Sequence, residues 1–147
     1  MKIRIIVAGK PALPFARAGV GEYLKRLGRF GAYEWETVRA GNAAEVSARL
    51  LERSAGCFRV ALDERGETPD TRQLADRMAD WERRGTIKTV AFLIGAADGH
   101  SEPLRRQCDW LLALSNLTLQ HELAALLLLE QLYRVATLRA GLPYHRD

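Results

Sequence analysis

A stacking aromatic ring, a titratable imidazole and a phosphate-binding guanidinium stand side by side near the carboxyl terminus, in Tyr144, His145 and Arg146. An aromatic ring can stack on a nucleic-acid base, an imidazole changes its charge near neutral pH, and a guanidinium binds phosphate. The competing interpretation is a frayed chain end, which is the usual state of terminal residues. From the residues alone, both interpretations stay open.

Three other features could contribute to a site. The loop Gly95–Gly99 is bounded by glycines, which would let backbone amides approach a ligand closely, although it could equally be a tight strand-to-helix turn. No Lys-Ser or Lys-Thr follows it, so a P-loop is not indicated. His121 precedes an apolar helix and either joins a site or simply fills the first turn. Glu130 and Arg134 stand four residues apart, in the order that favours a structural ion pair.

The composition indicates a single domain covering residues 1–147, with 48% hydrophobic and 27% charged residues. A net charge of +4 permits an anionic partner such as RNA without requiring one. Cys57 and Cys108 lie far apart with no histidine cluster, so neither a disulfide framework nor a metal site is expected. Met1–Ala8 is too short for a signal peptide, and Leu123–Leu129 falls short of the roughly 20 residues of a membrane span. We therefore expect a cytoplasmic protein.

Helices and strands must hold these candidate residues in place, and the hydrophobic pattern predicts where those elements lie. Short β-branched runs alternate with segments that have apolar residues at helical spacing, and a polar loop is expected at 63–66. Helices are expected over Phe15–Leu27, from Asn42 to about Ser54, from Asp70 or Thr71 to Gly85, as a short helix from Ser101, and from about Glu122 to Arg139. Strands are expected at Lys2–Ala8, Tyr33–Val38, Phe58–Leu62 and a central Val90–Ile94, with short extended pieces at Leu111–Leu114 and Leu117–Leu119.

This alternation predicts an α/β fold with a mostly parallel sheet and helices on both faces. In open α/β sheets, ligands bind beyond the carboxyl ends of the strands. Three loops satisfy that rule: the one after Leu62, the loop Gly95–Gly99, and the segment Leu114–Leu119. We expect these loops to form the binding site.

Across its whole length the chain resembles the SPOUT-class methyltransferases of large-subunit ribosomal RNA, the pseudouridine N3-methyltransferase H family. A terminal Tyr-His-Arg combined with Glu-Gln-Leu-Tyr-Arg is the most specific part of this resemblance. The matching stretches are Lys2–Gly9, Glu22–Leu27, Ala61–Gly66, Phe92–Gly95, Leu112–Ser115, Leu117–Leu119, His121, Glu130–Arg134 and Tyr144–Arg146.

The resemblance implies a trefoil knot in the carboxyl-terminal third, although ordinary connection rules exclude knots. It also implies a homodimer that uses S-adenosylmethionine to methylate N3 of a pseudouridine in 23S ribosomal RNA within the assembled ribosome. The apolar Leu123–Leu129 segment would lie in the dimer contact, and the tail of one subunit would complete the site of the other. Implied catalytic residues are His145 and Arg146, with Tyr144 and His121 as further candidates. Implied cofactor contacts are Leu62, Gly95, Leu114, Ser115, Asn116, Leu117, Thr118 and Leu119.

Two alternatives compete with this interpretation. The first is a divergent homologue that binds the ribosome or the cofactor without the same methylation activity. The second is a small-molecule or phosphate-binding α/β protein that uses Gly95–Gly99 and has no affinity for S-adenosylmethionine.

Overall fold

The computed structural model describes residues 1–144, and a parallel five-stranded sheet lies at its centre in the order β2-β1-β4-β3-β5. Its strands, as the structure has them, are β1 Lys2–Ala8, β2 Tyr33–Val38, β3 Phe58–Glu67, β4 Thr89–Ile94 and β5 Trp110–Leu112. The helices between and after them are α1 Pro14–Leu27, α2 Ala43–Arg53, α3 Thr71–Arg84, α4 Glu102–Arg106 and α5 His121–Arg139. The α/β class and the central position of β4 are therefore confirmed.

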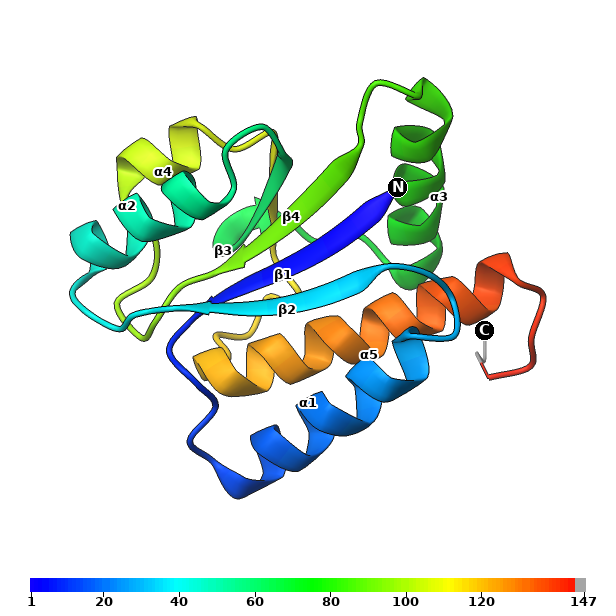
Figure 1. Cartoon of the computed structure of the whole chain (residues 1–147), viewed down its shortest axis with the longest axis horizontal. Helices are drawn as coiled ribbons and strands as arrows, with labels where there is room; N and C mark the ends of the chain where they lie inside the picture. Colours follow the sequence, from blue (N-terminus) through cyan, green and yellow to red (C-terminus); the bar gives the residue numbers. More distant parts are fainter. Residues whose placement is uncertain (145–147) are drawn as a thin grey trace.

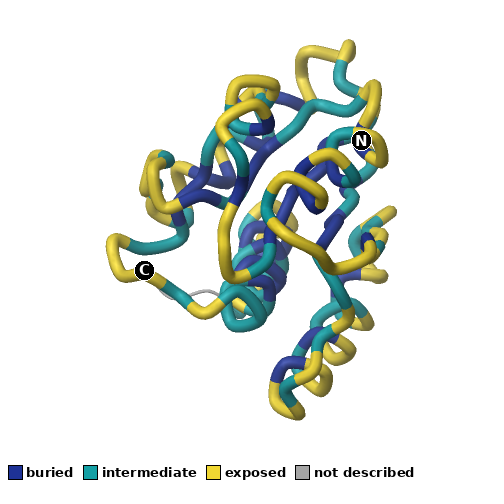
Figure 2. The backbone as a smooth tube through the Cα atoms, turned by 90° about the vertical axis from the view of Figure 1, so that its left-hand side faces the viewer, coloured by how far each residue is buried: buried dark blue, intermediate teal, exposed yellow. Residues whose placement is uncertain are grey.

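Helices cover both faces of this sheet, as predicted (Figure 1). Helices α1, α3 and α5 pack on one face, where side chains such as Ile5 and Phe92 form the larger core. Helices α2 and α4 pack on the other face over a smaller core that contains Ile6 and Leu93. Neighbouring strand residues point to opposite faces, so each core receives alternate residues of the same strands. Figure 2 shows the consequence, with buried strands at the centre and exposed outer helix surfaces.

Local sequence explains where several helices begin and end. The side chains of Asn42 and Asp70 accept hydrogen bonds from the backbone N–H groups of Glu45 and Gln73, which form capping boxes at the starts of α2 and α3. Gly85 ends α3 with a φ of 71°, in the left-handed region that glycine adopts without a Cβ clash. These caps are the ones that the sequence predicts.

Two expected segments differ from the structure. The polar segment 63–66 is not a loop, because β3 continues through it to Glu67, which pairs with Leu112 of β5. The N–H of Ala113 donates to the Glu67 carbonyl oxygen at 2.8 Å, so a long-range backbone bond holds the extension in place. The Leu117–Leu119 segment, predicted to be a short extended piece, lies in a loop outside the sheet.

Gly66 is the glycine at which an added side chain would meet the backbone most closely. A β-carbon at this position would lie 2.4 Å from both the carbonyl carbon and the carbonyl oxygen of Leu111. Real β-carbons essentially never approach backbone atoms so closely, so only glycine fits while β3 and β5 keep this contact. The end of β3 and strand β5 are thereby pressed together.

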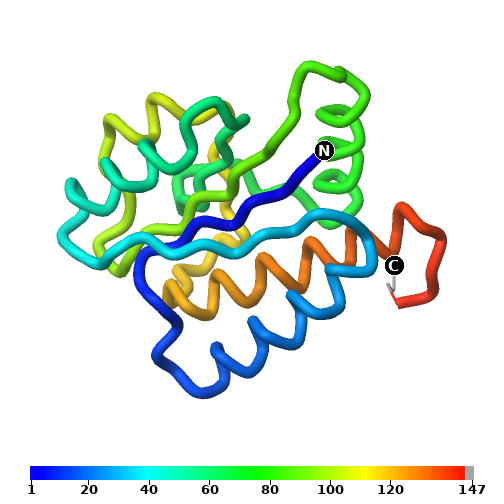
Figure 3. The backbone as a smooth tube through the Cα atoms, in the orientation of Figure 1, coloured from blue at the N-terminus to red at the C-terminus, as the bar shows by residue number. Residues whose placement is uncertain are grey.

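Helix α5 occupies the space between α1 and α3, and α1 and α5 run side by side (Figure 3). The α1–α5 contact is tight at Gly19, where an added β-carbon would lie 2.6 Å from a methyl group of Leu126. Among residues 1–144, no helix combines the length and the apolar character needed to cross a membrane.

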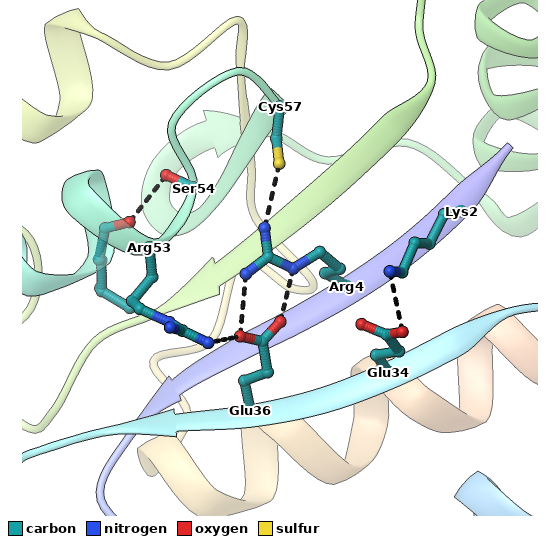
Figure 4. Close-up of polar contacts among 8 residues, drawn as sticks. Lys2, Arg4, Glu34, Glu36, Arg53, Ser54 and Cys57 are labelled. Atoms are coloured by element: carbon teal, nitrogen blue, oxygen red, sulfur yellow. Dashed lines mark hydrogen bonds and ion pairs between the residues drawn. The ribbon is translucent and has the colours of Figure 1, made fainter.

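A charged network joins β1, β2 and α2 at the side of the sheet where β2 is the outermost strand (Figure 4). The Arg4 guanidinium donates to both carboxylate oxygens of Glu36, at 2.5 and 2.9 Å, and to the Cys57 sulfur at 3.3 Å. Arg53 of α2 also donates to Glu36. The hydrogen bonds from Arg4 are the main reason that the pKa of Glu36 is lowered to about 2. The network ties the edge strand β2 to its neighbours.

Candidate functional site

A cavity of about 360 Å³ lies at the carboxyl ends of β3, β4 and β5. This volume falls within the roughly 300–1,000 Å³ of small-molecule sites. Its walls come from the three segments that the sequence predicts to converge there. The residues that line it are Leu62–Arg65, Ile94–His100, Leu112–Ser115, Leu117–His121 and Ala124.

Seven of the eight candidate cofactor contacts line this cavity: Leu62, Gly95, Leu114, Ser115, Leu117, Thr118 and Leu119. The eighth, Asn116, does not line it. Asn116 occupies the middle of a turn in which the Leu117 N–H donates to Ser115 Oγ at 2.9 Å. The structure therefore gathers the candidates in one place, and their contact with a cofactor stays a prediction.

The rim of the cavity is partly apolar and partly held by a side-chain hydrogen bond. Leu117 is 75% exposed although it is an aliphatic residue. Next to it, Thr118 Oγ1 donates to a carboxylate oxygen of Glu64 at 3.1 Å. This bond links the extension of β3 to the loop that precedes α5, and so connects two walls of the cavity across its mouth.

Buried charge lines one wall of the cavity. The Asp63 side chain is only 3% exposed, and Oδ1 accepts a hydrogen bond from the Arg65 backbone N–H at 2.9 Å. The Arg105 guanidinium lies 3.8 Å from Asp63 Oδ2 and donates to the His100 carbonyl oxygen at 2.5 Å. A carboxylate is therefore kept in a mostly buried position by a nearby cation and a backbone donor.

His100 completes that wall and was not among the candidates from sequence. It is 6% exposed, and its Nε2 lies 3.1 Å from the Leu93 carbonyl oxygen. A carbonyl oxygen only accepts hydrogen bonds, so Nε2 carries the proton and the ring presents a lone pair at Nδ1. Burial lowers the pKa of His100 and favours this neutral form. Its position directly after the loop Gly95–Gly99 was the one sequence signal that pointed to it.

His121 stands at the start of α5 and lines the cavity, as the sequence hypothesis requires. The Gln120 side chain fixes this end of the helix, because its oxygen accepts from the Leu123 N–H at 2.9 Å and its amide nitrogen donates to His121 Nδ1 at 3.3 Å. Nε2 is the other ring nitrogen that His121 can offer to a substrate or a water molecule.

Glu122 connects α5 to the start of α1. One of its carboxylate oxygens accepts hydrogen bonds from the backbone N–H groups of Ala12 and Leu13, at 2.6 and 3.1 Å. The negative charge lies at the amino terminus of α1, where the helix dipole favours it. The segment 9–13 is thereby held beside the cavity. Sequence reasoning missed this role, because the two partners are more than a hundred residues apart.

Tyr144 lies elsewhere, and the structure does not bring it to the cavity of its own chain. Its ring packs edge-to-face on Tyr133 at 4.6 Å between centroids, and the Arg134 guanidinium lies 5.0 Å from its centroid. Its hydroxyl donates to Glu130 Oε2 at 3.1 Å. The predicted ion pair between Glu130 and Arg134 is present at 3.0 Å and forms part of this packing. Within the chain, Tyr144 is thus an anchored residue.

The other two members of the tail, His145 and Arg146, fall outside the described residues 1–144. Their grouping as catalytic residues stays a prediction. The last described residue, Tyr144, is fixed beside Glu130 at the middle of α5.

Comparison with known proteins gives a consistent result. A family model described as "Predicted SPOUT methyltransferase" matches residues 1–145. A protein named ribosomal RNA large subunit methyltransferase H from Thermus thermophilus is 48% identical over 146 residues, covering 99% of each chain. Proteins of the same name from Deinococcus radiodurans and Neisseria gonorrhoeae are 39% and 35% identical, covering 99% and 100% of each chain.

Solved structures show the same fold at low sequence identity. A putative methylase family protein from Neisseria gonorrhoeae matches with a TM-score of 0.60 and 16% identity, covering 99% of this chain and 86% of that one. A tRNA (m1G37) methyltransferase from Aquifex aeolicus matches with a TM-score of 0.56 and 16% identity, covering 98% and 72%.

Proposed function

Because the chain belongs to the ribosomal RNA large subunit methyltransferase H family of SPOUT methyltransferases, we propose that it methylates N3 of a pseudouridine in 23S ribosomal RNA. The observation that carries the proposal is the full-length relationship at 48% identity. The cavity at the carboxyl ends of the strands supports it, since candidate cofactor residues from three separate segments converge there. The substrate would be the assembled ribosome in the cytoplasm.

The cavity suits S-adenosylmethionine in size and in the groups that it offers. Gly95 supplies a wall without a side chain, and Leu114 and Leu119 supply apolar surface. The bound cofactor would supply an electrophilic methyl group, and its transfer to N3 would release the N3 proton. The chain's own residues must therefore hold the base in place, exclude water and stabilise the negative charge that develops on the base.

The residues proposed for that task are His145 and Arg146, together with His121 at the cavity wall. A guanidinium can stabilise developing negative charge, and an imidazole can orient the base or accept its proton. The catalytic role expected for Tyr144 stays a prediction, and its anchoring within the chain suggests a positioning role as well. We propose that Tyr144 helps to position His145 and Arg146, which follow it directly in the chain.

The location of Tyr144 supports a site shared between two subunits. Glu130, its hydrogen-bond partner, follows His121 by nine residues in α5, which corresponds to about 14 Å along the helix. Three residues of fully extended chain span at most about 10 Å. A tail that starts at Tyr144 is therefore better placed to serve the cavity of a second copy than that of its own chain.

The outer surface of α1 and α5 is the proposed dimer contact. Phe15 is 52% exposed and Leu127 is 36% exposed, so both apolar side chains have surface available for a contact. Leu123 and Leu126 are partly buried on the same helix. Leu126 packs against Gly19 of its own chain, so it belongs partly to the fold. A second copy would cover the remaining apolar surface in a symmetric contact.

The proposed trefoil knot finds support in the crossing at Gly66. There the end of β3 meets Leu111, in the middle of β5, with no room for a side chain. The knot itself is proposed from the family to which the chain belongs, and the tight β3–β5 contact is compatible with it. The similarity to SPOUT-type structures agrees with this arrangement.

The test is direct. Ribosomes or large subunits that lack the modification are incubated with the protein and labelled S-adenosylmethionine, and the RNA nucleosides are then identified by mass spectrometry. We expect one new N3-methylpseudouridine per large subunit. Cofactor binding with no methylated product would support the divergent, ribosome-binding homologue. An absence of cofactor binding would support the small-molecule alternative.

A further inference from the structure

Arg105, on the short helix α4, contacts two walls of the cavity without lining it. Its Nη1 atom donates to the His100 carbonyl oxygen at 2.5 Å, and the same nitrogen lies 3.8 Å from Asp63 Oδ2. His100 ends the wall made by residues 94–100, and Asp63 belongs to the wall made by β3. One side chain therefore joins two parts of the cavity that are far apart in the sequence.

The contact between Arg105 and Asp63 lies in a mostly buried place. The Arg105 side chain is 19% exposed and that of Asp63 is 3% exposed, so water screens their attraction less than at an open surface. Asp63 Oδ1 accepts from the backbone N–H and the guanidinium of Arg65, at 2.9 and 3.4 Å, while Oδ2 faces Arg105. Loss of Arg105 would leave this carboxylate with less compensation for its burial.

The opposite wall, residues 94–100, is fixed mainly at its two ends. Its tip is exposed, and the Gly99 N–H donates to the Ala96 carbonyl oxygen at 2.9 Å within the loop itself. At the far end, the His100 ring bonds to the Leu93 carbonyl oxygen of β4 while the His100 carbonyl oxygen accepts from Arg105. The bond to Arg105 is thus the one that relates this loop to the charged end of β3.

We propose that Arg105 is a positioning residue for the cofactor, because it holds the loop against the end of β3 in the arrangement that binds S-adenosylmethionine. The inference rests on the proposed function, since it takes that cofactor as the ligand of the cavity. Without Arg105, the two walls adopt the binding arrangement for only part of the time, and the apparent dissociation constant rises by the inverse of that fraction. Once bound, the cofactor meets the same lining residues, so the methyl transfer step keeps its rate.

The experiment compares Arg105→Met with Arg106→Met on the same helix. Methionine keeps an unbranched side chain but removes the charge and the hydrogen-bond donors. Arg106 is the matched control, because its side chain is 70% exposed and its ion pair with Glu102 stays within α4. Isothermal titration calorimetry with S-adenosylmethionine gives the dissociation constant, thermal unfolding gives the stability, and methylation of unmodified ribosomes gives KM for the cofactor and kcat.

We expect Arg105→Met to bind the cofactor about tenfold more weakly and to raise KM in proportion, with kcat within about twofold of the parent value. Arg105→Lys, which keeps a positive charge near Asp63, should recover most of the lost affinity. Arg106→Met should match the parent protein throughout. If Arg105→Met does not fold, Arg105→Gln takes its place, since it lacks the charge and should weaken binding in the same direction.

Each failure has a distinct meaning. If Arg105→Met binds the cofactor as tightly as the parent protein, the role of Arg105 is wrong while the proposed function stands. The role is equally wrong if Arg106→Met loses as much affinity, or if Arg105→Met lowers the melting temperature and kcat with an unchanged dissociation constant. A parent protein that binds the cofactor but methylates nothing would overturn the proposed function alone, because calorimetry still tests Arg105. A parent protein that binds no cofactor would contradict both.

Discussion

The Tyr144 hydroxyl donates a hydrogen bond to Glu130 Oε2 over 3.1 Å, which fixes the start of the tail to the side of α5. Because that hydroxyl donates to Glu130, the 3.3 Å contact with Tyr23 is one in which Tyr23 donates. Burial is the first cause that raises the pKa of Tyr144, so the phenol stays protonated and keeps donating. The last described residue is therefore held by specific polar bonds as well as by ring packing.

Tyr144→Phe should reduce kcat/KM for ribosome methylation by about 3- to 10-fold, the value of one or two hydrogen bonds. The cofactor dissociation constant and the melting temperature should hardly change, because the ring still packs on Tyr133. Tyr33→Phe, a change of the same kind on β2, serves as the control and should keep full activity. If Tyr144→Phe mainly lowers the melting temperature, the residue is structural.

His145→Ala should reduce methylation by roughly 100-fold or more, which is typical of losing a group that assists proton transfer. Its melting temperature should match that of the parent protein. The measurement is single-turnover methylation of unmodified ribosomes beside a thermal scan. A large loss of stability would instead identify His145 as a structural residue.

Mixed dimers test whether two subunits share each site. One subunit carries His145→Ala, and the other carries Gly95→Leu, which fills the space beside His100 Nδ1. Each homodimer should be inactive, whereas the purified mixed dimer should regain about half of the parent activity, since one intact cavity meets one intact tail. An inactive mixed dimer would mean that each chain completes its own site.

Leu127→Glu should dissociate the proposed dimer. A carboxylate placed in an apolar contact without a partner costs several kcal/mol, so the dimer dissociation constant should rise by roughly 100-fold or more. Leu127 is the better probe than Leu126, which packs on Gly19 within the chain. Sedimentation analysis gives the mass, and circular dichroism verifies the fold. Ala44→Glu, on an exposed turn of α2, is the control and should leave the mass unchanged.

Glu36→Gln should remove part of the acid sensitivity of folding. The pKa of Glu36 is lowered from 4.5 to about 2 in the folded chain, so stability is fully present above pH 4.5 and is lost as the pH falls toward 2. After allowance for solvent screening, the contribution is on the order of 1–2 kcal/mol. Urea unfolding at a series of pH values should show a flatter profile for the variant. Glu34→Gln on the same strand, whose pair with Lys2 is largely exposed, should follow the parent profile.

A matched pair of glycine substitutions tests the backbone crossing. Gly66→Ala should cost at least about 2–3 kcal/mol, because its β-carbon meets backbone atoms of Leu111 that cannot turn aside. Gly21→Ala on α1 meets nothing within 4 Å and should stabilise the protein by up to about 1 kcal/mol. Denaturant unfolding measures both. A harmless Gly66→Ala would show that the crossing is looser than described.

Much of the framework could be predicted from sequence because its causes are local. Runs such as Val90–Ile94 bury both faces, and Asn42 and Asp70 supply their own caps. The rule that ligands bind beyond parallel strands was enough to bring the three cavity segments together. The extension of β3 was missed, because the pairing that holds Glu67 comes from β5, far along the chain.

The features that sequence analysis missed depend on contacts between residues that are distant in the chain. His100 stands out only when its burial and its empty hydrogen-bond position are known together. The anchoring of Tyr144 depends on residues that α1 and α5 bring side by side. The knot was expected through resemblance alone, since connection rules argue against threaded chains.

The contact between Gly66 and Leu111 also joins parts of the cavity that are far apart in the sequence. The cavity takes one wall from the end of β3 and another from the segment after β5, and these walls meet at that crossing. A nascent chain that ends near residue 100 holds only part of the enclosure and would retain no ligand. Any molecule that binds the finished cavity therefore recognises the completed chain alone, and its binding free energy adds to the stability of the fully formed protein.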